Sequence, residues 1–160
     1  MAEWLRSKDM TAGQRVDMPP VWLVGFIVLV WVQVRLWPGA TAPQLLSRFA
    51  GILLFIGGLA LMVWALWTFR RHATTVVPHQ TPERIITKGP FARSRNPIYL
   101  GDVLVLTGGI LWYGAWPSLL LIPLFVTILI RRFIAPEEAR MKQCFGSEYA
   151  EFARKTPRWI

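Results

Sequence analysis

Long apolar runs separated by short polar stretches dominate the pattern of the chain. Residues 20–36 form a run of 17 residues whose only charge is Arg35, close to its end. Residues 49–69 form a second run of 21 uncharged residues. At a helical rise of about 1.5 Å per residue, each run approaches the roughly 30 Å thickness of the hydrocarbon core of a bilayer. The pattern therefore predicts two membrane-spanning helices.

Two shorter apolar runs follow, residues 98–112 and 116–130, with 15 residues each. They are joined by only three residues, which predicts a helical hairpin. Each is shorter than the roughly 20 residues of a full span, so we expect tilting, kinking or extension into polar neighbours. From Pro136 onward the pattern becomes amphipathic. There we predict a helix at the membrane interface, bent near Gly146.

Small residues also suggest how the helices pack. Gly51, Gly57, Gly58 and Ala60 interrupt the second apolar run. Small side chains let two membrane helices approach closely, so a neighbouring helix is expected along this face. The predicted fold is all-α, an integral membrane bundle of four transmembrane helices followed by a C-terminal amphipathic helix.

Composition supports the membrane assignment. The chain is 54% hydrophobic and contains nine Trp, with a mean hydropathy of +0.39. Its net charge of +9 comes from basic residues that flank the apolar runs. Membrane lipid headgroups are thus the expected partners, and nucleic acid is not. Cys144 is the only cysteine, which excludes an internal disulfide, and no metal-binding spacing is present.

The distribution of Lys and Arg predicts the orientation. Residues 1–19 contain three, residues 70–95 six and residues 131–160 seven, leaving only Arg35 and Arg48 elsewhere. Because cytoplasmic flanks are enriched in Lys and Arg, both termini and the loop before residue 95 are expected in the cytoplasm. The chain divides into a cytoplasmic segment (1–19), two transmembrane helices (20–69) and a region with the cytoplasmic loop, two further helices and the C-terminal helix (70–160).

The most informative stretch is residues 89–101, which read GPFARSRNPIYLG. Proline removes a backbone donor and restricts the residue before it, so the first part of this stretch is predicted to be a shaped loop. Pro97 suits the first position of a helix. The free N–H groups at that helix start are suited to binding a carboxylate.

This stretch resembles the Arg-His/Asn-Pro-x-Tyr signature of the isoprenylcysteine carboxyl methyltransferase and phospholipid methyltransferase superfamily of membrane enzymes. Residues 131–138 (RRFIAPEE) and 145–149 (FGSEY) are similar to the Glu-Glu and Phe-Gly-x-x-Tyr tail of the same superfamily. The resemblance covers residues 76–160. It implies a methyltransferase that buries S-adenosylmethionine between its last helices and C-terminal segment. The cytoplasmic loop and the C-terminal amphipathic helix would then form the cofactor pocket, and residues 70–160 would be the catalytic region.

The resemblance also implies roles for individual residues. Arg95, Arg132 and Glu138 are the expected catalytic residues. The expected cofactor-binding residues are His79, Glu83, Ile85, Ile86, Gly89, Phe91, Asn96, Pro97, Ile98, Tyr99 and Glu137. The superfamily usually has His where this chain has Asn96, and asparagine cannot titrate, which puts a proton-transfer role there in doubt.

Structural explanations compete with these roles. Residues 95–99 could anchor the chain at the interface, Glu137 and Glu138 could stabilise a helix N-terminus, and Arg131 and Arg132 could be stop-transfer charges. Asp102 lies one turn inside an apolar run, where a carboxylate is costly. We expect it to form an ion pair with Arg95 or Arg93.

Several functions remain open at this point. The arginines at 131 and 132 favour an anionic lipophilic acceptor, such as the carboxylate of a prenylated cysteine. A phospholipid amine is the alternative acceptor. An NADPH-dependent sterol-type reductase of related fold would use Arg70, Arg71, Arg84, Lys88 and Arg93 to bind phosphates. A non-catalytic membrane protein is the last alternative. No Gly-rich turn of a soluble nucleotide-binding fold is present.

Overall fold

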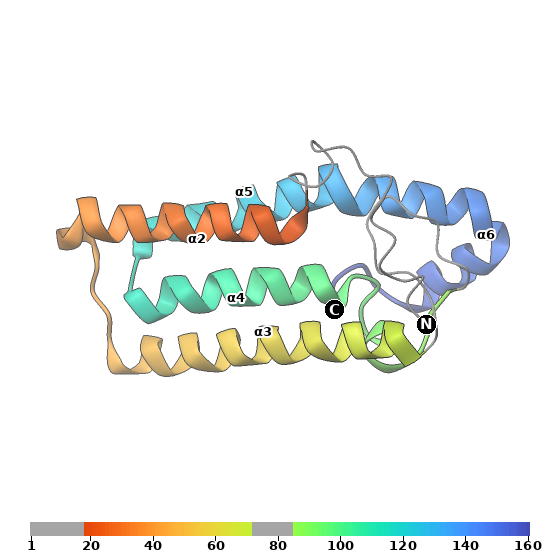
Figure 1. Cartoon of the computed structure of the whole chain (residues 1–160), viewed down its shortest axis with the longest axis horizontal. Coiled ribbons are helices and arrows are strands. Elements are labelled where there is room, and N and C mark those ends of the chain that lie inside the picture. Colours follow the sequence, from red (N-terminus) through yellow and green to blue (C-terminus); the bar gives the residue numbers. More distant parts are fainter. Residues whose placement is uncertain (1–17, 72–84) are drawn as a thin grey trace, which may run out of the picture.

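The computed structural model describes residues 18–71 and 85–160, and every regular element in these ranges is a helix. The helices run alongside one another down the long axis of the molecule (Figure 1). The main ones are α2 (Pro19–Leu36), α3 (Leu45–Arg71), α4 (Pro97–Tyr113), α5 (Leu121–Ile128) and α6 (Ala135–Lys155). The predicted all-α class holds for the described residues.

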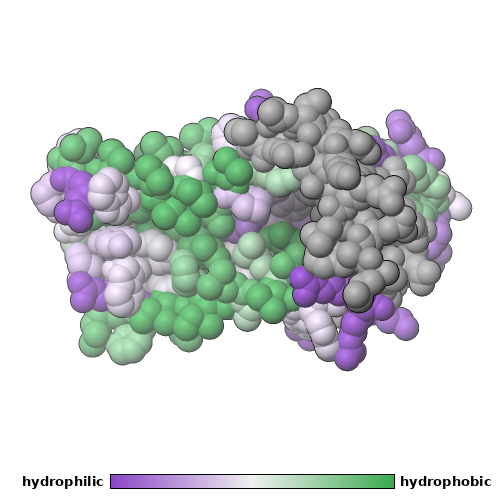
Figure 2. Space-filling view, viewed as in Figure 1, coloured by the Kyte–Doolittle hydropathy of each residue, from purple (hydrophilic) through white to green (hydrophobic). Residues whose placement is uncertain are grey.

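Three helices are long and apolar enough to cross a membrane: α2, α3 and the helical stretch Trp116–Lys155. The remaining predicted span, α4, is a shorter apolar helix of 17 residues. In the space-filling view, hydrophobic residues cover the middle of the bundle and polar residues gather at both ends (Figure 2). This distribution fits a bundle whose outer surface faces lipid.

Helix α3 begins four residues earlier than the apolar run alone predicts. The hydroxyl of Ser47 accepts a hydrogen bond from the backbone N–H of Gln44 at 3.1 Å and donates one to the Gln44 carbonyl at 2.9 Å. These bonds satisfy polar groups at the helix start, so the helix extends beyond the apolar residues. At its other end, α3 stops at Arg70 and Arg71.

The closest helix contact joins α3 to α4 through paired glycines. A Cβ atom added at Gly51 would lie 2.7 Å from the carbonyl oxygen of Gly108, and one at Gly58 would lie 2.7 Å from that of Gly101. The predicted close approach is therefore confirmed for Gly51 and Gly58. It is wrong for Gly57, which has nothing within 4 Å of an added Cβ.

The second half of the predicted hairpin is not one uniform helix. A 3-10 turn, Trp116–Leu120, leads into α5, and a π-helical segment, Leu129–Ile134, connects α5 to α6. The apolar span thus continues directly into the amphipathic helix. Inside the bundle, Phe125, Leu129 and Ile134 are fully buried. They form the core together with α2 and α4 residues, including Phe26, whose ring centroid lies 4.9 Å from that of Phe125.

Candidate active site

The loop before α4 is fixed to the end of α3 by an apolar cluster. Ile86 and Phe91 are buried and pack with Ala65, and the Phe91 ring meets Phe69 edge-on with centroids 4.9 Å apart. Between them, Gly89 has a φ of +63°, a conformation that side chains other than glycine rarely adopt. This packing places the following residues, Ser94 to Pro97, at one end of the bundle.

The start of α4 has the features that the sequence predicts. Pro97 is its first residue, and the side chain of the N-cap residue Asn96 makes no capping hydrogen bond to the helix. Asn96 is buried; its backbone N–H donates to the hydroxyl of Ser94 at 3.2 Å, and its Nδ2 donates to the carbonyl oxygen of Arg158 at 3.1 Å. Asn96 therefore connects the loop to the C-terminal tail, a role that needs no titrating group.

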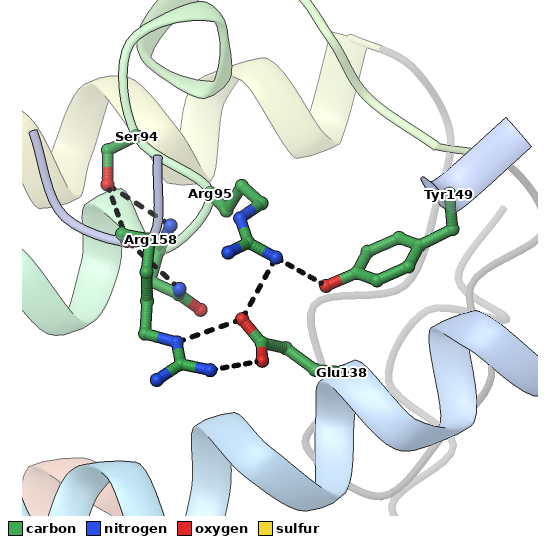
Figure 3. A network of polar contacts seen from close by, with 6 residues as sticks. Ser94, Arg95, Glu138, Tyr149 and Arg158 are labelled. Carbon is green, nitrogen blue, oxygen red and sulfur yellow. Dashed lines mark hydrogen bonds and ion pairs between the residues drawn. The ribbon is translucent and has the colours of Figure 1, made fainter. Parts of the chain in front are cut away.

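Glu138 is the centre of a charged network (Figure 3). Its Oε1 lies 3.1 Å from Nη1 of Arg95, and Arg158 donates to both of its oxygens, from Nε at 3.1 Å and from Nη2 at 2.6 Å. Nη1 of Arg95 also donates to the hydroxyl of Tyr149 at 3.2 Å. The network joins the loop, the first turn of α6, the far part of α6 and the tail. The hydrogen bonds to Glu138 also raise the pKa of Arg158 above its ordinary value.

The C-terminal tail reaches this network because α6 reverses direction. Gly146 has φ +49° and ψ −116°, which confirms the predicted bend. Beyond the bend, the tail lies against the loop: the N–H of Arg95 donates to the carbonyl of Pro157 at 3.0 Å, and the Ser94 hydroxyl donates to that of Arg158 at 3.3 Å. Trp159 packs against the main core.

A second polar contact lies beside the first. The hydroxyl of Tyr99 donates to Oε2 of Glu137 at 3.0 Å, and the Tyr99 ring stacks near Phe133 with centroids 6.4 Å apart. Glu137 follows Pro136, beyond the apolar part of its span.

Two charged side chains keep buried atoms without hydrogen-bond partners in the described part of the chain. They are Nε of Arg95 and both carboxylate oxygens of Asp102. The predicted ion pair between Asp102 and Arg95 or Arg93 is thus wrong. The guanidinium of Arg95 contacts Glu138 and Tyr149 instead of Asp102. The side chain of Arg93 is exposed, whereas Asp102 is buried.

The structure brings most of the predicted site residues to one end of the bundle. Arg95, Asn96, Tyr99, Glu137 and Glu138 belong to the two contacts above, and Pro97 begins the helix that carries Tyr99. Ile86, Phe91 and Ile98 belong to the apolar cluster of the same loop. Ile85 is partly buried before the loop. Arg132 is exposed, with its guanidinium 5.4 Å from the ring centroid of Trp22. His79 and Glu83 lie outside the described residues.

Sequence reasoning missed Arg158 as a site residue. It lies two residues before the C-terminal Ile160, where neither a helical pattern nor a motif marks it. The only available signal was its chemistry, because a basic residue can pair with one of two adjacent glutamates. As to metals, no group of His, Cys, Asp or Glu in residues 18–71 and 85–160 is arranged to hold an ion.

The fold and this site together define a class of protein: a multi-helix membrane protein whose polar site joins a loop, a helix start and a C-terminal tail. Comparison with known proteins gives the family. Residues 46–148 match the phospholipid methyltransferase family, and the chain belongs to it. Arg158 and Tyr149 both lie beyond the matched residues.

One curated relative is an uncharacterised protein of Haemophilus influenzae. It is 32% identical over 63 residues, which are 39% of this chain and the whole of the relative. No solved structure matches the chain at a significant level.

Proposed function

We propose that this protein is an S-adenosylmethionine-dependent methyltransferase that acts on a lipophilic acceptor. Family membership supports the transfer of a methyl group at a membrane. The single observation that supports the site is the start of α4: Asn96 makes no side-chain cap there, and Arg95, two residues before Pro97, has a buried Nε without a partner among the described residues. The first N–H groups of α4 and this Nε are hydrogen-bond donors, and together they suit a ligand carboxylate.

The residues present fit the cofactor at this place. S-adenosylmethionine supplies an electrophilic methyl group when bound, and its methionine part carries a carboxylate. Arg95 and the first N–H groups of α4 would hold that carboxylate. Glu137, which already accepts a hydrogen bond from Tyr99, would hold polar groups of the same ligand. The protein then acts mainly by positioning the reactants and excluding water.

The Glu138 network has a different task in this proposal. Because Glu138 is only 13% exposed and binds two arginines, its carboxylate is committed to holding the loop and the tail together. We therefore assign Glu138 to positioning Arg95 rather than to contact with the reacting atoms. This assignment replaces the direct catalytic role expected from the resemblance.

The acceptor is proposed from charge. The exposed side chains of Arg131 and Arg132 end the apolar span at the depth of lipid headgroups, which favours an anionic acceptor such as the carboxylate of a prenylated cysteine. A carboxylate needs no general base. A phospholipid amine is the second candidate acceptor. It must lose a proton before it attacks the methyl group, and the Glu137 carboxylate, beside Tyr99, is the base available for that step.

Calorimetric binding in detergent tests the cofactor assignment. We expect the purified protein to bind S-adenosylmethionine and its demethylated product, and not NADPH. Arg95→Ala should weaken binding of both by at least about tenfold, whereas Arg93→Ala, an exposed arginine of the same loop, should leave it unchanged. Tyr149→Phe is a further control, because it removes only the hydrogen bond that Arg95 donates to Tyr149 and keeps the Arg95 side chain. Binding of NADPH instead would favour a reductase and contradict the proposal.

A further inference from the structure

Asp102 is a buried carboxylate that the site described above does not use. Only 1% of its surface is exposed, and neither oxygen has a hydrogen-bond partner in the described residues. It lies in α4 five residues after Pro97, which places it about 7–8 Å from the start of the helix. Tyr99, one turn earlier, contacts Glu137, so Asp102 lies one helical turn deeper in the bundle than this contact.

Such a carboxylate is costly in apolar surroundings. The buried residues that follow it along α4, Val105 and Leu106, are hydrocarbon side chains. Burying an unpaired charge costs several kcal/mol, and ionisable residues inside membrane helices are mostly paired or functional. The basic residues of the adjoining loop do not pair with Asp102, since Arg95 binds Glu138 and Arg93 is exposed. A ligand that brings a positive charge would remove this cost.

We propose that Asp102 is the counter-ion for a positively charged onium group of a bound ligand. The group is either the sulfonium of the methyl donor or the ammonium of a lipid amine. For the sulfonium, the inference rests on the proposed function. The donor's methionine part carries a carboxylate and a sulfonium separated by three carbon atoms, and the site offers donors at the helix start and a carboxylate one turn deeper.

The test compares charged and neutral ligands that are otherwise alike. Binding to wild type and Asp102→Asn would be measured by calorimetry in one detergent, with S-adenosylmethionine against its neutral demethylated product and with decylamine against decanol. We expect Asp102→Asn to weaken binding of the charged member of one pair at least tenfold and to leave the neutral member within twofold. The pair affected identifies the source of the charge. Glu151→Gln, which neutralises an exposed carboxylate of α6, should change neither pair.

Thermal stability without ligand distinguishes this role from a structural one. An unpaired buried carboxylate destabilises the protein, so Asp102→Leu should raise the thermal midpoint by about 2–4 °C. A carboxylate held in a structural ion pair would give the opposite result, because its removal would strand the partner charge. A lower midpoint in both Asp102→Asn and Asp102→Leu would therefore overturn the proposal.

The remaining outcomes are equally decisive. Equal weakening of charged and neutral ligands, or no change in any of them, would also overturn the role of Asp102. Failure of wild type to bind either S-adenosylmethionine or its product would instead contradict the proposed function. The decylamine and decanol pair would still test Asp102 in that case.

Discussion

Glu138 shows how one side chain organises the site at the residue scale. Its carboxylate accepts hydrogen bonds from Arg158 and lies 3.1 Å from Arg95, so it joins two segments far apart in the sequence. Charge-assisted hydrogen bonds of this kind are about twice as strong as neutral ones, and partial burial strengthens them further. The position of the Arg95 guanidinium therefore depends on Glu138.

Replacing Glu138 should loosen this whole network. Glu138→Gln removes the charge that both arginines share, so we expect the free energy of unfolding to fall by about 1–3 kcal/mol. Affinity for S-adenosylmethionine should fall too, because Arg95 loses its fixed position. Thermal unfolding and calorimetry in detergent measure the two effects. The matched control is Glu151→Gln, an exposed pair with Lys155, for which we expect no change.

Glu137 should behave differently from its neighbour. Its carboxylate accepts a hydrogen bond from Tyr99 and takes no part in the Glu138 network described above, so we assign it to the ligand rather than to the loop. Glu137→Gln should thus weaken S-adenosylmethionine binding about tenfold while leaving the thermal midpoint close to that of wild type. Unchanged affinity would remove Glu137 from the site.

At the scale of elements, the helices were predictable and their irregular joints were not. Apolar length and flanking charges place α2, α3 and α4 to within a few residues. The π-helical segment Leu129–Ile134 has no such signal, because its residues also suit an α-helix. It nevertheless buries Phe133 and Ile134 while Arg131 and Arg132 remain exposed, just before the two glutamates.

The part of the site formed by motif residues was predictable from the sequence, whereas the part formed by the C-terminal tail was not. The motifs at the starts of α4 and α6 contain Tyr99 and Glu137, and the predicted topology places both helix starts at the same end of the bundle, where the two side chains meet. The tail contact through Arg158 depends on the reversal at Gly146, which is a three-dimensional effect. Likewise, Asp102 has no partner among residues 18–71 and 85–160 because the Arg95 side chain turns to Glu138, and sequence spacing does not report the direction of a side chain.

The bend at Gly146 can be tested directly. Gly146→Ala introduces a Cβ at a φ of +49°, where nothing lies within 4 Å, so its cost of about 1–3 kcal/mol is conformational rather than steric. We expect the segment after the bend to detach more often, giving faster trypsin cleavage after Arg154 and Lys155. Ser147→Ala, at the exposed neighbouring position, should leave the cleavage rate unchanged.

The contact between α3 and α4 offers a matched pair of glycines. Gly58→Ala places a Cβ 2.7 Å from the Gly101 carbonyl and 2.9 Å from Cγ2 of Val105, which forces the helices apart. We expect a loss of about 1–3 kcal/mol in stability, measured as a lower thermal midpoint. Gly57→Ala meets open space and should be neutral or slightly stabilising. Equal effects at both positions would contradict this packing.

At the scale of the whole molecule, the distribution of Lys and Arg predicts how the chain is oriented in the membrane, and labelling of one side chain can test this orientation. Cys144 is the only cysteine of the chain and is exposed on α6, at the same end as the site. If that end faces the cytoplasm, a membrane-impermeant maleimide should label Cys144 in permeabilised cells and not in intact ones. Labelling of intact cells would reverse the predicted topology.

The most direct test of the account is methyl transfer itself. The purified protein would be reconstituted into vesicles of total membrane lipid and supplied with S-adenosylmethionine carrying a tritiated methyl group. We predict that label enters the fraction extracted by organic solvent, that Arg95→Ala lowers its rate at least tenfold, and that Arg93→Ala does not. Wild-type protein that binds the donor yet transfers no label to any lipid fraction would contradict the proposal of a lipophilic acceptor.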